Sequence, residues 1–293
     1  MRVVLLGTKG GPAVRQKGSW PTSSFVEIGG HGAVVDCGAG VTRGLVEAGV
    51  SLRDLPDIYL THLHSDHCLE LGPLLHTAWT TGLGRPLNVH GPAGTAALVA
   101  HFWQAMAFDI DIRIADEGRP DIRSLVRVHE YGEGPVSAGD GLAVTALRVI
   151  HPPVREAYAL RFEAGGQAVV FSGDTAFCPA IAGFAAGAAI LVHEAMLAEG
   201  VEKIIARTPN ASDRLRTHLY ASHTLAADAG RVARMAGVGH LVLNHLVPAD
   251  DPDIGEAEWL AAVRETWDGP LTVGRDGLEV VPGAIPRRPG TKA

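Results

Sequence analysis

The sequence of 293 residues predicts an α/β protein in which β-sheets are covered by outer helices. Two observations lead to this prediction. Apolar runs of strand length alternate with helical patterns in both halves of the chain, and a block between Leu125 and Phe171 contains strand-like runs. No short-period repeat and no linker divides the chain.

The individual elements follow from apolar patterning and from the Gly, Pro and Asn residues that interrupt it. The expected strands, in chain order, are Val3–Leu6, Phe25–Ile28, Ala33–Val35, Ile58–Leu60, Leu87–His90, Leu125–Val128, Ala143–Ile150, Tyr158–Phe162, Ala168–Phe171, Ile190–His193 and Leu241–Asn244. The expected helices are Val41–Ala48, a segment after Ser65 that reaches Trp79, Pro92–Ala107, Thr224–Ala236 and Glu256–Trp267.

Composition is that of an ordinary globular protein, with 46% hydrophobic and 19% charged residues. The net charge is −7 and no run is rich in Lys or Arg, which weighs against nucleic acid as a partner. No apolar stretch approaches the length of a membrane span. Cys37, Cys68 and Cys178 are far apart and form no C-x-x-C pair, so we expect a reducing, cytoplasmic location.

Candidate metal ligands come from both halves of the chain, which favours one domain over residues 1–281. Residues 282–293 are rich in Pro, Gly and basic side chains, and we expect a flexible C-terminal tail there.

The segment Thr61–His67 follows the apolar run Ile58–Leu60 and contains three imidazoles and one carboxylate. In an extended segment residues i and i+2 point the same way, so His62 and His64 can bind one ion together. A turn then lets Asp66 and His67 face a second ion. Imidazole and carboxylate ligands suit zinc, iron or manganese.

Three further candidates stand at the ends of strand-like runs: His151, Asp174 and His245. Each alone is as well explained by a structural role, because a histidine at a strand end is often a satisfied polar residue and Gly-Asp-Thr is a common turn. Together with the first motif they indicate a metal site on the rim of a sheet.

These motifs, together with others further along the chain, resemble the ordered motifs of the metallo-β-lactamase-fold hydrolases. The resemblance is strongest to the branch that holds ribonuclease Z and the zinc-dependent arylsulfatases. It implies a four-layer αβ/βα sandwich with two mixed β-sheets flanked by helices. The segments that carry it are Thr61–His67, His151, Phe171–Thr175, His193–Ala195, Ser222–Thr224 and Asn244–His245.

The resemblance also implies a ligand set for two divalent ions, zinc before manganese or iron. One ion would be held by His62, His64 and His151, and the other by Asp66, His67 and His245. Asp174 would bridge both, and a bridging aspartate argues against β-lactam hydrolysis as the main activity.

Two such ions would share a water and lower its pKa, so that hydroxide attacks an ester. Asp66 would orient that water or accept its proton. The resemblance assigns His223 as general acid and Glu194 as the residue that orients it. The alternative is that Ser222–Thr224 only caps the helix that follows.

Ribonuclease Z carries a long arm that grips transfer RNA, but only 22 residues separate His151 from Asp174 here, with a hairpin between them. We therefore expect a small-molecule ester substrate, a sulfate ester or a phosphodiester, in preference to nucleic acid, and no membrane as a partner. The alternatives are a ribonuclease-Z-like endonuclease or phosphodiesterase, a carboxylic ester, lactone or β-lactam hydrolase, and a flavin-linked redox relative. The sequence does not determine the oligomeric state, and a homodimer is left open because relatives often pair.

The sequence does not decide which segments form the walls of the pocket. Leu98–Phe108 is either a hydrophobic wall over the ions or plain core, and Met196–His218 is an insertion that either meets a ligand or is a solvated face. The remaining histidines lack a motif and are expected to be structural: His31, His76, His90, His101, His129, His218 and His240.

Overall fold

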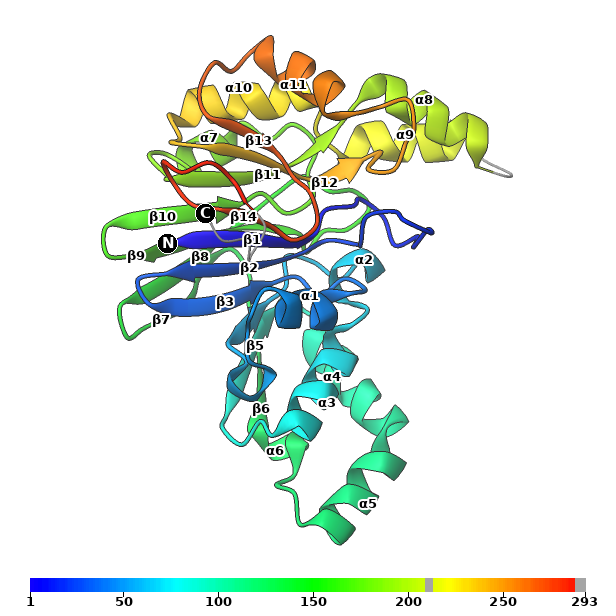
Figure 1. Ribbon diagram of the computed structural model, residues 1–293, viewed down its shortest axis with the longest axis vertical. Coiled ribbons are helices and arrows are strands. Elements are labelled where there is room, and N and C mark those ends of the chain that lie inside the picture. The colour runs from blue at the N-terminus through cyan, green and yellow to red at the C-terminus, as the bar shows by residue number, and fades with distance from the viewer. Residues whose placement is uncertain (209–212, 288–293) are drawn as a thin grey trace.

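The computed structural model describes residues 1–208 and 213–287, and two seven-stranded sheets lie face to face at its centre (Figure 1). The first sheet has the order β14 (Leu278–Val280), β1 (Arg2–Gly7), β2 (Ser23–Ile28), β3 (His31–Val35), β4 (Asp57–Tyr59), β5 (Leu87–Gly91) and β6 (Val126–Glu130). The second has the order β13 (Leu271–Val273), β12 (Leu241–Val247), β11 (Ile190–Met196), β10 (Gln167–Phe171), β9 (Tyr158–Ala164), β8 (Leu142–Arg148) and β7 (Gly134–Gly139).

Helices cover the outer face of each sheet, which confirms the predicted four-layer αβ/βα sandwich (Figure 1). The first sheet carries α1 (Val41–Glu47), η1 (Leu52–Asp54), α2 (Ser65–Cys68), α3 (Leu71–Thr81), α4 (Thr95–Ala105), α5 (Ala107–Glu117) and α6 (Ile122–Leu125). The second carries α7 (Ala180–Phe184), α8 (Ala198–Arg207), α9 (Asp213–Ser222), α10 (Ala226–Ala236) and α11 (Glu256–Arg264).

Strand β1 shows why the layers form. Its side chains alternate between the two faces of the sheet, and both faces are apolar. Val3 and Leu5 lie in the core between the two sheets, whereas Val4 and Leu6 lie in the core under the helices. Burial on both faces therefore follows directly from the unbroken apolar run.

Both sheets are mixed, and their parallel halves position the site. Strands β3, β4, β5 and β6 are parallel, as are β10, β11, β12 and β13. Parallel strands end at the same edge of a sheet, so the residues that follow β4, β10 and β12 meet on one side of the sandwich.

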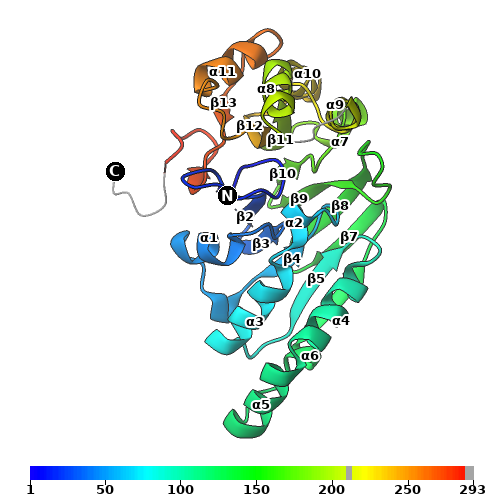
Figure 2. The ribbon, with the colours of Figure 1, turned by 90° about the vertical axis from the view of Figure 1, so that its right-hand side faces the viewer.

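Several elements were not expected from the sequence, among them the short strands β13 and β14 and the short helices α6 and α7. Strand β7 lacks an apolar alternation, and α5, α8 and α9 were not predicted. Helices α4 and α5 project away from the sandwich (Figure 2), and Phe108 at the start of α5 is 83% exposed. A helix that buries one narrow stripe leaves a weaker signal than a strand that is buried on both faces.

Side chains of both sheets share the central core, which supports the proposal that residues 1–281 form one domain. Beyond residue 281 the chain turns back, and Arg287 donates its backbone N–H to the carbonyl of Glu279 at 3.0 Å. The rest of the expected tail, residues 288–293, lies outside the described residues. Within residues 1–208 and 213–287, no helix has the length and apolar character needed to cross a bilayer.

Candidate metal centre

Five segments of the chain deliver the seven predicted ligands to one edge of the sandwich. His62 and His64 follow β4, and the short helix α2 adds Asp66 and His67. The other three come from the second sheet. His151 follows β8, Asp174 follows β10, and His245 lies near the end of β12.

The seven side chains form two groups that share Asp174. In one group His62, His64, His151 and Asp174 offer ligand atoms that all lie within 4.8 Å of one another. In the other, the same limit of 4.8 Å holds for Asp66, His67, Asp174 and His245. These are the two predicted ligand sets, with Asp174 between them.

Asp174 lies close to imidazoles of both groups. Its Oδ1 is 3.2 Å from Nε2 of His67, and its Oδ2 is 3.1 Å from Nε2 of His245. Nε2 of His62 lies 3.7 Å from Oδ2. One carboxylate thus faces both groups, with Oδ2 near His62 and His245 and Oδ1 near His67.

The imidazoles are oriented by partners on their far nitrogen. Nδ1–H of His67 donates to Asp36 at 2.8 Å, and Nδ1–H of His151 donates to the carbonyl of Ser222 at 2.9 Å. The Thr61 hydroxyl is 2.9 Å from Asp36 and donates to it, so at 3.1 Å it accepts from Nδ1–H of His62. A proton on Nδ1 leaves the lone pair on Nε2, so three lone pairs converge on the shared centre.

His245 reaches the site through a local irregularity in β12. The pairing of β11 with β12 slips between Glu194 and Ala195, and His245 has a φ of +43°. Gly10 lies against its ring, because a Cβ on that residue would stand 2.9 Å from Cε1 of His245. Such left-handed backbone in a non-glycine residue is typical of functional sites.

The residues fit a metal pair. Nε2 of His62 and of His67, and Oδ1 of Asp174, are buried and have no hydrogen-bond partner among the described residues. Buried lone pairs without partners are costly, and bound cations would satisfy them. Imidazole with carboxylate suits zinc, manganese and iron alike, so the donor set admits two divalent ions without selecting one.

The pKa shifts of two of the predicted ligands, Asp174 and His151, also fit metal binding. Burial tends to raise the pKa of Asp174, but His245, His67 and His62 outweigh it and hold that pKa well below its usual range. Burial lowers the pKa of His151 to about 4. A carboxylate that stays ionised and an imidazole that stays neutral are the forms that bind metal.

The predicted acid pair, His223 and Glu194, lies beside the second group. Nδ1 of His223 is 3.1 Å from both carboxylate oxygens of Glu194, and its ring stacks on His245 with centroids 5.3 Å apart. Glu194 is held by the backbone N–H of Thr175 at 2.6 Å. Burial lowers the pKa of His223, but Glu194 more than compensates and raises it to about 9.

Sequence reasoning missed two residues that support the ligands. Asp36 follows β3, is 2% exposed and binds both His67 and Thr61. Its position just after a buried strand was the available signal, as it was for Asp174. Gly11 donates its backbone N–H to Oδ2 of Asp66 at 2.8 Å, and a backbone donor leaves no signal in the sequence.

A cavity of about 420 Å³ opens over the metal centre, and both predicted wall segments can now be placed. Helices α8 and α9 form one wall through Ile204, Leu215, His218 and Leu219. No residue of Leu98–Phe108 lines this cavity, so that segment is not a wall over the ions. Part of the Met196–His218 insertion, residues 209–212, lies outside the described part of the chain.

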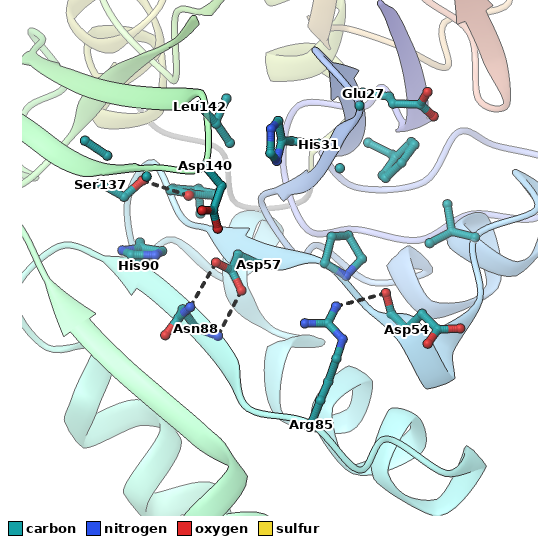
Figure 3. Close-up of a pocket in the computed structure, with 18 of the residues that line it drawn as sticks. Glu27, His31, Asp54, Asp57, Arg85, Asn88, His90, Ser137, Asp140 and Leu142 are labelled. Carbon is teal, nitrogen blue, oxygen red and sulfur yellow. Dashed lines mark hydrogen bonds between the residues drawn. The ribbon is translucent and has the colours of Figure 1, made fainter. Parts of the chain in front are cut away.

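A larger cavity, of about 750 Å³, lies elsewhere on the sandwich (Figure 3). It lies beside the starts of β3 and β4, at His31 and Asp57, and is overhung by the β7–β8 turn at Asp140. It is lined by none of the seven predicted ligands. Cavity size therefore does not mark the metal centre.

Fold and site together define a metal-dependent hydrolase of the metallo-β-lactamase fold that acts on ester bonds. Solved structures of the same fold include the metallo-β-lactamase fold protein YhfI from Bacillus subtilis, at TM-score 0.67 and 23% identity over 95% of this chain and 98% of that one. Another is human tRNase Z, short form, at TM-score 0.68 and 18% identity over 97% and 100% of the two chains.

Sequence comparison gives the family. The family model described as Anti-Pycsar protein Apyc1 matches residues 1–227. Ribonuclease Z of Mycobacterium bovis (strain BCG / Pasteur 1173P2) is 36% identical over 279 residues, which cover 94% of this chain and 96% of that protein. The chain therefore belongs to the Anti-Pycsar protein Apyc1 family and shares a family with proteins named ribonuclease Z.

These relatives overturn the expectation of a small-molecule ester substrate in preference to nucleic acid. The name ribonuclease Z designates an enzyme of RNA, and the relative that bears it matches this chain over nearly its full length. The short His151–Asp174 interval was therefore no argument against RNA. Nor was the net charge of −7, since bound divalent ions add positive charge where a phosphodiester would lie. The relatives favour the phosphodiesterase alternative over a sulfate ester. The homodimer stays open, and the cytoplasmic location stays a prediction.

Proposed function

We propose that this protein is a two-metal phosphodiesterase that cleaves RNA in the manner of ribonuclease Z, with precursor transfer RNA as the substrate to test first. The observation that carries the proposal is the convergence of two four-residue groups on Asp174 in a chain 36% identical to ribonuclease Z over 94% of its length. Two cations a few ångströms apart are the usual arrangement for in-line attack on a phosphodiester.

In this proposal His62, His64 and His151 hold one ion, Asp66, His67 and His245 the other, and Asp174 both. The ions would supply a hydroxide nucleophile and neutralise charge on the phosphate. The chain's own contribution is to fix the ligands: Asp36, Thr61 and the Ser222 carbonyl hold the Nδ1 protons of the imidazoles. Asp66 is held by the Gly11 amide and would orient the attacking water.

His223 would donate a proton to the leaving oxygen. Its Nδ1–H is bound by Glu194, so Nε2 is the nitrogen available to the cavity that His223 lines. The charge of Glu194 keeps the ring protonated at neutral pH, which is the form a general acid requires. Glu194 is the positioning residue of the pair.

The cavity supports a substrate larger than a bare phosphate. It carries cationic side chains, Lys9 and Arg15, beside the metal centre and an apolar wall from α8 and α9. Lys9 is almost fully buried and pairs with Asp250 at 2.5 Å, so Arg15 is the cation open to an anionic backbone.

The experiment is cleavage of a precursor transfer RNA with a 3′ trailer by the metal-loaded protein. Bis-p-nitrophenyl phosphate, p-nitrophenyl sulfate, p-nitrophenyl acetate and nitrocefin are assayed beside it. We expect cut RNA and hydrolysed phosphodiester, both lost on chelation and regained with added metal. Intact RNA together with metal-dependent turnover of the sulfate, the acetate or nitrocefin would contradict the proposal.

A further inference from the structure

His218 is a side chain of the active-site cavity to which the proposed mechanism gives no role. It lies on α9, one helical turn before Ser222 and next to His223 in space, with ring centroids 6.2 Å apart. Its ring is also 6.5 Å from that of His151, and it lines the cavity over the metal centre. The expectation that it is merely structural does not account for this position.

Hydrogen bonding determines which nitrogen of His218 carries the proton. The Ser222 hydroxyl donates its single hydrogen to the carbonyl of Pro152 at 2.6 Å. The same oxygen lies 3.3 Å from Nδ1 of His218 and can only accept there, so Nδ1–H is the donor. In the neutral ring, the usual form above pH 7, Nε2 then carries the lone pair.

That Nε2 is available to a ligand. Within residues 1–208 and 213–287 it makes no hydrogen bond, and it is not among the buried polar atoms. The cavity therefore presents a hydrogen-bond acceptor at His218 beside a donor at His223. Phosphodiester oxygens have no hydrogen to donate at neutral pH, so this acceptor suits a hydroxyl or amino group of a substrate rather than its phosphate.

We propose that His218 is a specificity-determining residue that accepts a hydrogen bond from a ribose hydroxyl next to the scissile phosphodiester. The inference rests on the proposed function and names what selects RNA within it. The ribose is the part of a nucleotide adjacent to the phosphate. The His218 ring lies 6.2 Å from the ring of His223, the proposed donor to the leaving oxygen, and is therefore close enough to contact that ribose. The 2′-hydroxyl is the group by which a protein distinguishes RNA from DNA at a given position.

The test compares an all-ribose RNA substrate with one that carries a single 2′-deoxyribose on the 5′ side of the scissile bond. For the wild-type protein we expect kcat/KM to favour the ribose substrate roughly five- to tenfold, the value of one neutral hydrogen bond. In His218→Ala the ratio should fall to about one, and in His218→Gln, which keeps an acceptor oxygen, it should recover in part. His101→Ala, an exposed histidine on α4, is the matched control and should keep the wild-type ratio.

A second readout separates this inference from the proposed function. A ribonucleoside monophosphate and its 2′-deoxy counterpart are compared as inhibitors of bis-p-nitrophenyl phosphate hydrolysis, with and without His218→Ala. A ribose preference that depends on His218 supports the inference even if precursor RNA stays uncut, which would overturn the proposed function alone. Cleavage of RNA with the same ribose-to-deoxyribose ratio in wild type and His218→Ala would overturn the inference and leave the function standing.

Discussion

Two histidine-containing regions of the same sandwich show what makes a metal centre. At the large cavity Tyr59, His90 and His129 stack across β4, β5 and β6, with centroids 4.6 Å and 5.0 Å apart. His129 binds Asn88 at 3.1 Å, and in the described part of the chain this row belongs to no group that could hold a metal ion.

At the metal centre the imidazoles converge instead of stacking in register. In each of His62, His67 and His151 a hydrogen bond fixes Nδ1, and the opposite side of the ring faces the shared carboxylate of Asp174. The number of histidines and the size of a cavity are therefore poor guides to the location of a metal centre. Fixed lone pairs that point at one another, with anionic charge between them, are the informative feature.

The largest effect is expected from Asp174→Asn. Because both groups share Asp174, the substitution removes charge from both at once. We expect bound metal to be lost and kcat to fall on the order of 10³-fold or more. Metal analysis and turnover of bis-p-nitrophenyl phosphate measure the two effects. The matched change at the other cavity, His129→Ala, should alter neither, and retention of both metals in Asp174→Asn would refute the shared role.

Replacing His223 by Ala tests the proton donor. Loss of a positioned general acid typically costs 10²- to 10⁴-fold, and we expect a fall in kcat in that range with metal content unchanged. Both quantities are measured on the same preparation. Loss of metal in this variant would mean that His223 is itself a ligand, as its proximity to Glu194 and His245 allows.

Asp36→Asn should have a smaller effect, because Asp36 touches a predicted ligand and no substrate. An amide in its place still accepts a hydrogen bond but carries no charge to strengthen the ligand. We expect metal affinity to fall roughly 10- to 100-fold, with activity restored by excess metal. A chelator titration of the variant beside the wild type measures this, and equal affinities would remove Asp36 from the metal centre.

The pH profile gives the smallest effect. The pKa of His223 is raised from 6.5 to about 9, so the charged pair with Glu194 stabilises the fold fully below about 6.5 and is lost as pH rises through about 9. Activity that needs the protonated ring should fall about tenfold per pH unit above that value. Rates measured from pH 6 to 10 test this prediction. If the residual activity of His223→Gln shows the same loss above pH 9, that loss is due to the titration of another group.

Much of the site could be predicted from the sequence because its ligands follow apolar strands and stand in a spaced motif. His62, His64, Asp66 and His67 lie within six residues, and the resemblance to the metallo-β-lactamase-fold hydrolases supplied the grouping of the other three. Asp36 was missed since it is an isolated polar residue in its local sequence. Its hydrogen bond to His67 exists only where β3 comes next to β4 and the ligands that follow it.

The sequence by itself determined the sandwich, since strands buried on both faces need unbroken apolar runs, and it determined which side chains have metal-binding chemistry. It could not determine which cavity holds the chemistry, that α8 and α9 rather than Leu98–Phe108 wall it, or which nitrogen of each imidazole is free. Those facts depend on contacts between residues far apart in the chain, and such contacts arise only when the two sheets pack together.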